Sequence, residues 1–167
     1  MNARQRLWQH FGTPAAIYGT IVYASLIAAS GLHLDPDDAV LPVLVFSSVT
    51  IVVFWIAHIF AFALARHGDE RVNAAGPWAS TKHAFNDATG MLEAALVLSV
   101  PLILGTLGLM QAQRSVQASL IVGVATLAVL GFLAFTPRHT QWWLRIAGAF
   151  GTALLGVAII VIEALLH

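Results

Sequence analysis

Apolar residues fill five long stretches of this chain, and polar residues are confined to the segments between them. A helix needs about 20 consecutive, mostly apolar residues to cross the hydrocarbon core of a bilayer. Within lipid, the backbone must also satisfy its own hydrogen bonds, which an α-helix does. The pattern therefore predicts an all-α polytopic integral membrane protein. We expect one transmembrane helical domain over residues 1–167, with spans near 14–34, 42–65, 84–109, 116–135 and 142–166.

Prolines and polar residues mark the ends of the predicted helices. Pro14 and Pro42 suit the first helical turn, where a missing N–H costs little. Pro101 lies inside the third predicted span and is expected to bend it. The only sizeable polar connection covers residues 66–83. The first apolar run is longer than the core of a signal peptide, so we expect it to be retained as an anchor.

The composition excludes a soluble domain. Hydrophobic residues make up 59% of the chain and charged residues only 10%, whereas soluble domains carry about 25% charged residues. The formal net charge is +0, and no basic stripe indicates nucleic-acid binding. The absence of cysteine excludes disulfides, thiol nucleophiles and iron–sulfur clusters. No nucleophile elbow, P-loop or dinucleotide fingerprint occurs, so the sequence does not support a soluble-type enzyme.

The distribution of positive charge predicts the orientation of the spans. If the N-terminus is cytoplasmic, Arg114 is the only one of the 8 Lys and Arg residues on the outer side. Inner segments of membrane proteins carry an excess of Lys and Arg. We therefore predict an N-in/C-out, multi-pass protein of the cell membrane (the inner or plasma membrane) of a bacterium. The inner residues are Arg4, Arg6, Arg66, Arg71, Lys82, Arg138 and Arg145.

Two ionisable side chains interrupt the apolar spans. By residue count from the predicted cytoplasmic ends, His58 lies roughly 10 Å deep in the second span, and Glu93 lies roughly 13 Å deep in the third. Ionisable residues inside a membrane are costly and mark functional sites by default. Glu93 must be neutral, paired or in contact with water, and His58 could supply the pairing.

A polar stripe on the third span leads to Glu93. Asn86, Gly90 and Glu93 share one helix face, and His83 and Asp87 form an i,i+4 pair beside them. Beyond Glu93 the sequence is apolar, which favours a pocket open to the cytoplasm over a pore. We predict a small transport or channel-like protein. Its proton or cation site is predicted to consist of His58, Glu93, Asp87 and Asn86.

Two alternatives remain open at the sequence level. In the first, a divalent transition metal is the cofactor, held by the imidazoles and carboxylates of His58, His83, Asp87 and Glu93. In the second, the contact of His58 with Glu93 only holds two helices together, and the protein is a non-catalytic accessory or scaffold protein. The predicted transport function requires no cofactor.

Small residues recur at every fourth position in three of the spans. Helices in lipid associate through close backbone approach, which such seams allow. Besides the lipid bilayer itself, the seams could bind a second copy or another membrane protein, or could serve packing within one subunit. They consist of Ala16, Thr20, Ala24 and Ala28; of Ser115, Ser119 and Gly123; and of Gly148, Thr152 and Gly156.

Three segments resemble a family of small bacterial polytopic membrane proteins. They are "YGTIVYASLIA" in the first span, "VFWIAHIFA" in the second and "MLEAALVLSVPLILG" in the third. In that family, a W-x-A-H-x-[FY]-A segment carries the histidine of the second helix, and a glutamate lies in the third. The resemblance implies a multi-pass membrane fold and points to Trp55, His58 and Glu93, but it supplies no reaction or ligand.

Overall fold

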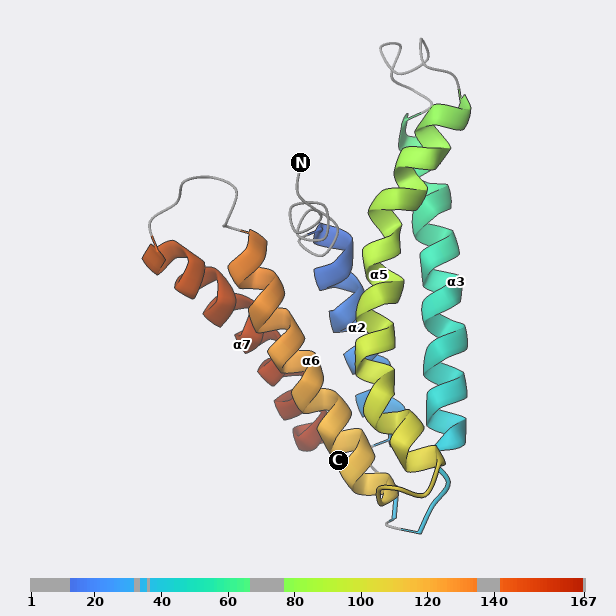
Figure 1. Cartoon of the computed structure of the whole chain (residues 1–167), viewed down its shortest axis with the longest axis vertical. Coiled ribbons are helices and arrows are strands. Elements are labelled where there is room, and N and C mark those ends of the chain that lie inside the picture. Colours follow the sequence, from blue (N-terminus) through green and yellow to red (C-terminus); the bar gives the residue numbers. More distant parts are fainter. Residues whose placement is uncertain (1–12, 32–33, 36, 67–76, 135–141, 167) are drawn as a thin grey trace.

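A computed structural model describes residues 13–31, 34–35, 37–66, 77–134 and 142–166. Five α-helices account for most of this part of the chain (Figure 1). All five are long and apolar enough to cross a membrane. This confirms the predicted all-helical class and agrees with a multi-pass membrane protein. The helices are α2 (Pro14–Gly31), α3 (Leu41–Arg66), α5 (Pro77–Thr106), α6 (Ala112–Ala134) and α7 (Trp142–Leu166).

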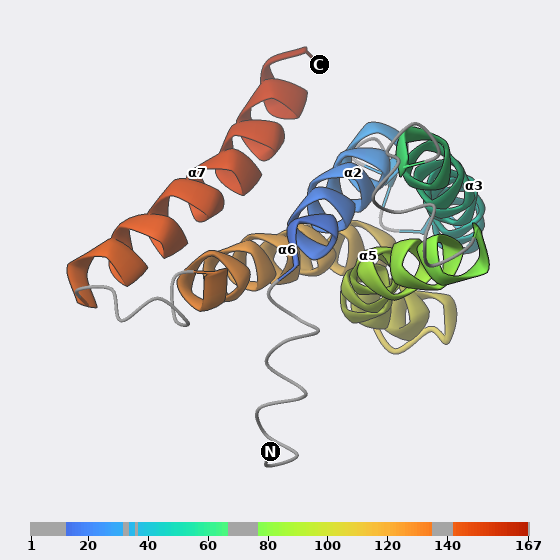
Figure 2. The same ribbon diagram turned by 90° about the horizontal axis from the view of Figure 1, so that it is seen from above.

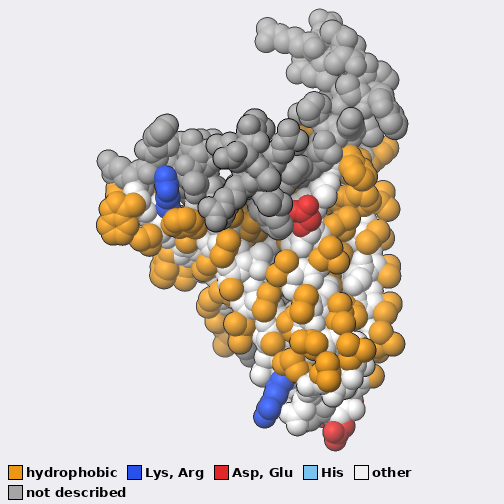
Figure 3. Space-filling model, in the orientation of Figure 1, with side chains coloured by type: hydrophobic (Ala, Val, Ile, Leu, Met, Phe, Trp, Pro, Cys, Tyr) orange, Lys and Arg blue, Asp and Glu red, His pale blue; other side chains and the backbone are white. Residues whose placement is uncertain are grey.

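Helices α2 and α5 form the centre of the bundle. Half of the residues in their membrane spans are buried (50% in each), against 6% in the span of α7. Helix α2 contacts all four other helices, whereas α7 packs mainly on α6 (Figure 2). Hydrophobic side chains cover most of the described surface on the face shown in Figure 3. A surface of this kind suits contact with lipid.

Helix α5 begins and ends earlier than the sequence predicted. Pro77 opens the helix at its first position, seven residues before the predicted start at residue 84. The helix stops at Thr106 because Gly108 adopts a positive φ of 73°. The N–H of Leu109 donates to the carbonyl of Leu104, and that of Gly108 to Gly105, both at 3.0 Å. This Schellman motif satisfies the terminal carbonyl groups and turns the chain toward α6.

The predicted small-residue seam of α2 lies inside the bundle. Ala16, Thr20, Ala24 and Ala28 are all at most 5% exposed. Beside this seam, a Cβ atom on Gly19 would lie 2.7 Å from the Cα atom of Met91 in α5. Since real Cβ atoms almost never approach that closely, only glycine allows this backbone contact. The seam therefore serves packing within the chain.

The seam of α7 packs against α6 in the same way. The hydroxyl of Thr152, which has one proton to donate, lies 2.7 Å from the carbonyl oxygen of Leu127 across the interface and 3.0 Å from that of Gly148 in its own helix. A Cβ atom on Gly131 would lie 2.5 Å from the Gly148 carbonyl oxygen and would also overlap Thr152. The two backbones are therefore in direct contact at Gly131.

Large side chains close the middle of the bundle. Tyr23 and Ile27 of α2 and Met91, Leu98 and Leu102 of α5 are each 0% exposed. They pack the contact between α2 and α5.

Candidate functional site

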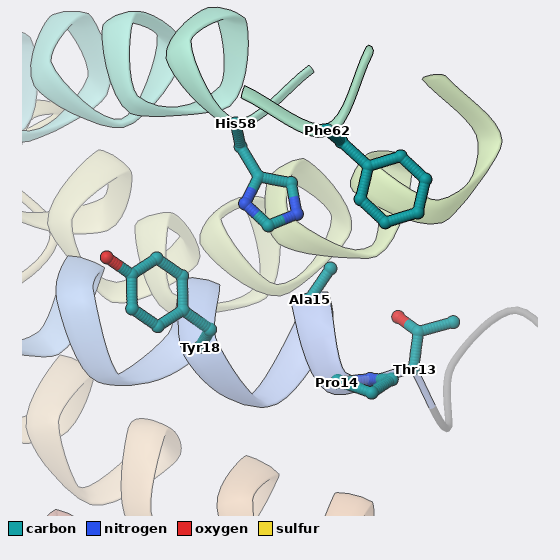
Figure 4. A pocket seen from close by; sticks show the side chains of 6 residues that line it. All are labelled: Thr13, Pro14, Ala15, Tyr18, His58 and Phe62. Carbon is teal, nitrogen blue, oxygen red and sulfur yellow. The ribbon is translucent and has the colours of Figure 1, made fainter. Parts of the chain in front are cut away.

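A cavity of about 390 Å³ lies between the first turns of α2 and the last turns of α3 (Figure 4). We call it the α2–α3 pocket. Figure 4 shows α2 on one side of the pocket, and His58 and Phe62 of α3 on the other. The six lining residues are Thr13, Pro14, Ala15, Tyr18, His58 and Phe62.

The residues at the start of α2 determine the form of one side of the pocket. Thr13 caps the helix, because its Oγ1 accepts a hydrogen bond from the N–H of Ala16 at 3.3 Å. Pro14 occupies the first helical position, as predicted, and fixes the direction in which α2 leaves the cap. Tyr18 follows one turn later and is 46% exposed. The cap, the proline and the tyrosine therefore form a short apolar wall with few polar atoms.

The α3 side depends on the contact of that helix with α5. Trp55 packs edge-to-face on Phe85 of α5, with ring centroids 5.2 Å apart. This contact fixes the rotation of α3 about its axis. His58 and Phe62, one turn apart on the same face, then lie over α2.

The rings of the pocket are nearly parallel. The centroid of His58 lies 6.4 Å from that of Tyr18, with 26° between the ring planes. The corresponding values for His58 and Phe62 are 6.5 Å and 24°. Neither ring nitrogen of His58 hydrogen-bonds to another described residue; its contacts are with these two rings. The imidazole thus keeps its hydrogen-bonding capacity for another molecule.

No hydrogen bond joins His58 to Glu93 in the part of the chain that the structure describes. Oε2 of Glu93 is buried and has no hydrogen-bond partner, and no ion pair joins Glu93 to His58. Gly90, which lies on the predicted polar face with Glu93, faces α2, at Thr13 and Ala16. Counting residues along two helices predicted a similar depth, but it carried no information about rotation.

Both residues also lie closer to the end of the apolar spans than predicted. The apolar part of α3 ends at Phe62, and that of α5 begins at Ala88 rather than Ala84. His58 is then about 6 Å from that end along its helix, and Glu93 about 8 Å. Both residues therefore lie within about two helical turns of the ends of these apolar segments.

The remaining predicted ligands belong to α5, but their side chains lie outside the described part of the structure. They are His83, Asn86 and Asp87. Among the described side chains, no three His, Asp or Glu residues come close enough to hold a metal. The predicted metal set and the predicted ion site therefore remain predictions.

A second polar cluster, in the middle of the bundle, was not predicted as a unit. The hydroxyl of Tyr23 lies 2.6 Å from that of Ser99 in α5 and 3.3 Å from that of Ser48 in α3. The hydroxyl of Ser99 donates its only proton to the carbonyl oxygen of Ala95, which lies 2.8 Å from Oγ. Tyr23 must therefore donate to Ser99, and Ser48 to Tyr23. This chain of hydroxyls ties three helices together and ends at a backbone carbonyl.

Sequence reasoning identified His58 but missed most of its pocket. From the sequence, Tyr18 was one of four polar residues of the first span that could line a cavity, and the structure places it in this pocket. The available signal was the i,i+4 spacing of His58 and Phe62, which puts two rings on one face. Nothing in the sequence indicated that this face meets the first turn of α2.

No protein-family model, curated protein or solved structure matches this chain. The resemblance of its second span to a family of small bacterial membrane proteins therefore stays a prediction.

Proposed function

We propose that this protein binds a lipophilic molecule taken from the cytoplasmic leaflet of a bacterial plasma membrane, in the α2–α3 pocket. The observation that carries the proposal is a cavity of about 390 Å³ containing an imidazole with free ring nitrogens. Binding sites for small molecules are typically about 300–1,000 Å³, mostly apolar and provided with a few polar groups. Binding of this kind would suit a carrier or an accessory protein.

The depth of the pocket matches an amphiphilic molecule. Tyr18 is one turn from the start of α2, and His58 is one turn from the end of the apolar part of α3. This is the level at which lipid headgroups meet acyl chains, and aromatic side chains with polar ends favour it. A molecule in the same layer could place its polar end at His58 and its chain among the lipids.

The predicted N-in/C-out orientation assigns the pocket to the cytoplasmic side. The turn between α2 and α3 and the turn between α5 and α6 lie at one end of the bundle, and the start of α2 lies at the other (Figure 1). Arg114 is in the exposed part of α6 next to the second turn. The single outer positive charge predicted from the sequence is therefore at the end opposite the pocket.

Labelling of single cysteines tests this orientation, because the chain has no cysteine of its own. In intact cells, a membrane-impermeant maleimide should label Asp37→Cys and Gln113→Cys, both in exposed positions at the predicted outer end. Thr13→Cys should react only after the cells are permeabilised. The reverse pattern would place the pocket in the outer leaflet and overturn the assignment.

Photo-crosslinking tests the pocket itself. In proteoliposomes, a long-chain alcohol carrying a diazirine should attach to Tyr18, His58 or Phe62 in preference to exposed faces. Ala15→Phe puts a ring into the cavity and should reduce this crosslinking roughly tenfold, equivalent to about 1.4 kcal/mol of binding free energy. Ala29→Phe, an exposed position of the same helix, is the matched control and should leave it unchanged.

Two results would contradict binding at the pocket. The first is crosslinking spread evenly over the lipid-facing surface and insensitive to Ala15→Phe. The second is a proton or cation flux into proteoliposomes that is abolished by both His58→Ala and Glu93→Gln. That flux would restore the transport function, for which the buried, unpartnered Oε2 of Glu93 is the favouring observation.

A further inference from the structure

We infer that the ligand of the α2–α3 pocket is an uncharged molecule with a planar ring, a carbonyl oxygen on that ring and a hydrocarbon tail. A quinone is the chemical class that combines these features. The inference rests on the proposed function and specifies its ligand. It depends on the shape, the charge and the hydrogen bonding of the pocket.

The shape of the pocket favours a flat group. The angle between the ring planes is 26° for Tyr18 and His58 and 24° for His58 and Phe62. Figure 4 shows His58 and Phe62 standing over the first turn of α2, with the side chains of Ala15 and Pro14 below them. Aromatic rings prefer offset-stacked or edge contacts with other rings. A planar ring makes such contacts in this cavity, whereas a flexible acyl chain must lose conformational entropy to occupy it.

The charge of the pocket favours a neutral group. Among the described residues that line the pocket, none is Asp, Glu, Lys or Arg. An ionised ligand would lose its hydration in this apolar site without gaining an opposite charge, and burial of an unpaired charge costs several kcal/mol or more. Phosphate and carboxylate headgroups are therefore poor ligands.

The hydrogen bonding of the pocket favours an oxygen acceptor. A neutral imidazole carries one N–H donor and one nitrogen acceptor, and both are free in His58. Oγ1 of Thr13 accepts the N–H of Ala16 and keeps its own proton to donate. A carbonyl oxygen near His58 would satisfy the N–H group of the imidazole.

Equilibrium dialysis of the full-length protein in nanodiscs tests this inference with matched probes. A benzoquinone with a decyl tail should bind saturably, and about tenfold more tightly than decylbenzene, which has the same ring and tail but no oxygen. Decanoate should bind no better than decylbenzene. In protein labelled with ¹⁵N-histidine, the quinone should shift the ring resonances of His58, identified by their loss in a His58→Gln variant.

Variants connect the binding to the histidine. His58→Leu should weaken quinone binding about tenfold, whereas His58→Gln, which keeps an N–H donor, should retain most of it. Phe60→Leu is the control on the same helix, since Phe60 is 69% exposed and does not line the pocket. A helical circular-dichroism spectrum like that of the wild type shows that each variant is folded.

The outcomes separate the ligand from the function. Preferential quinone binding that depends on His58 supports the inference. Saturable binding of decylbenzene and the quinone with equal affinity, lost in Ala15→Phe, would overturn the ligand class and leave the pocket as a site for hydrocarbon chains. Absence of saturable binding for every probe would overturn both the ligand class and the proposed function.

Discussion

Replacement of Tyr23 by alanine is expected to lower the free energy of unfolding by about 3–5 kcal/mol, the range found when a buried aromatic side chain is truncated. Tyr23 is 0% exposed and lies where α2, α3 and α5 meet. The variant loses the ring and leaves a cavity. It also removes the hydroxyl that accepts a hydrogen bond from Ser48 and donates one to Ser99. Unfolding by SDS in mixed micelles, followed by far-UV circular dichroism, measures the effect.

Two further variants separate the ring from the hydroxyl. Tyr23→Phe keeps the ring and should cost only about 0.6 kcal/mol, the average measured for hydrogen bonds between helices in a membrane protein, and not more than the maximum of about 1.7 kcal/mol. Tyr18→Ala, on the same helix, removes a ring that is 46% exposed and should change stability much less than Tyr23→Ala. Equal losses from Tyr18→Ala and Tyr23→Ala would show that Tyr23 is not at the centre of the bundle.

The second large effect is expected at the contact between α6 and α7. Gly131→Ala should lower the free energy of unfolding by about 1–3 kcal/mol, because the added methyl group would overlap Thr152 and the backbone of Gly148. Neither backbone can move without separating the helices. Since α7 packs mainly on α6, loss of this contact should also increase the susceptibility of α7 to proteolysis.

Gly151→Ala is the matched control for Gly131→Ala. The same methyl group at Gly151 would meet no atom within 4 Å. Alanine is favoured over glycine in a helix by up to about 1 kcal/mol, so this variant should be neutral or slightly more stable. If Gly131→Ala were as stable as Gly151→Ala, the two helices would not be in direct backbone contact.

Local sequence patterns predicted one residue of the α2–α3 pocket but not the neighbours of that residue. The sequence was sufficient to find His58 as a titratable ring inside an apolar helix and to place it near one end of that helix, the end predicted to be cytoplasmic. It also suggested Glu93 as the partner, because both were counted to a similar depth. The structure gives His58 two aromatic neighbours, and it leaves Oε2 of Glu93 without a hydrogen-bond partner. Depth follows from the constant rise of a helix, but the direction of a side chain depends on how the helices are rotated.

The sequence by itself determined that the chain is helical and long enough to cross a membrane five times. Lipid excludes unsatisfied backbone groups, so continuous apolar runs of this length have few other structures available. It also determined the start of α2 at Pro14, and it contained the Gly108 signal that ends α5, although the predicted third span ran past it. These features depend on residues adjacent in the chain.

Tertiary structure alone decided which helix faces meet. The contact of Gly19 with Met91, the edge-to-face packing of Trp55 on Phe85 and the hydroxyl chain at Tyr23 fix the rotation of α2, α3 and α5. The outer faces of these helices are almost as apolar as their inner faces, so hydropathy does not separate them. In a membrane, close packing and hydrogen bonds select the contacts. Both depend on residues far apart in the sequence, and so does the pocket that they create.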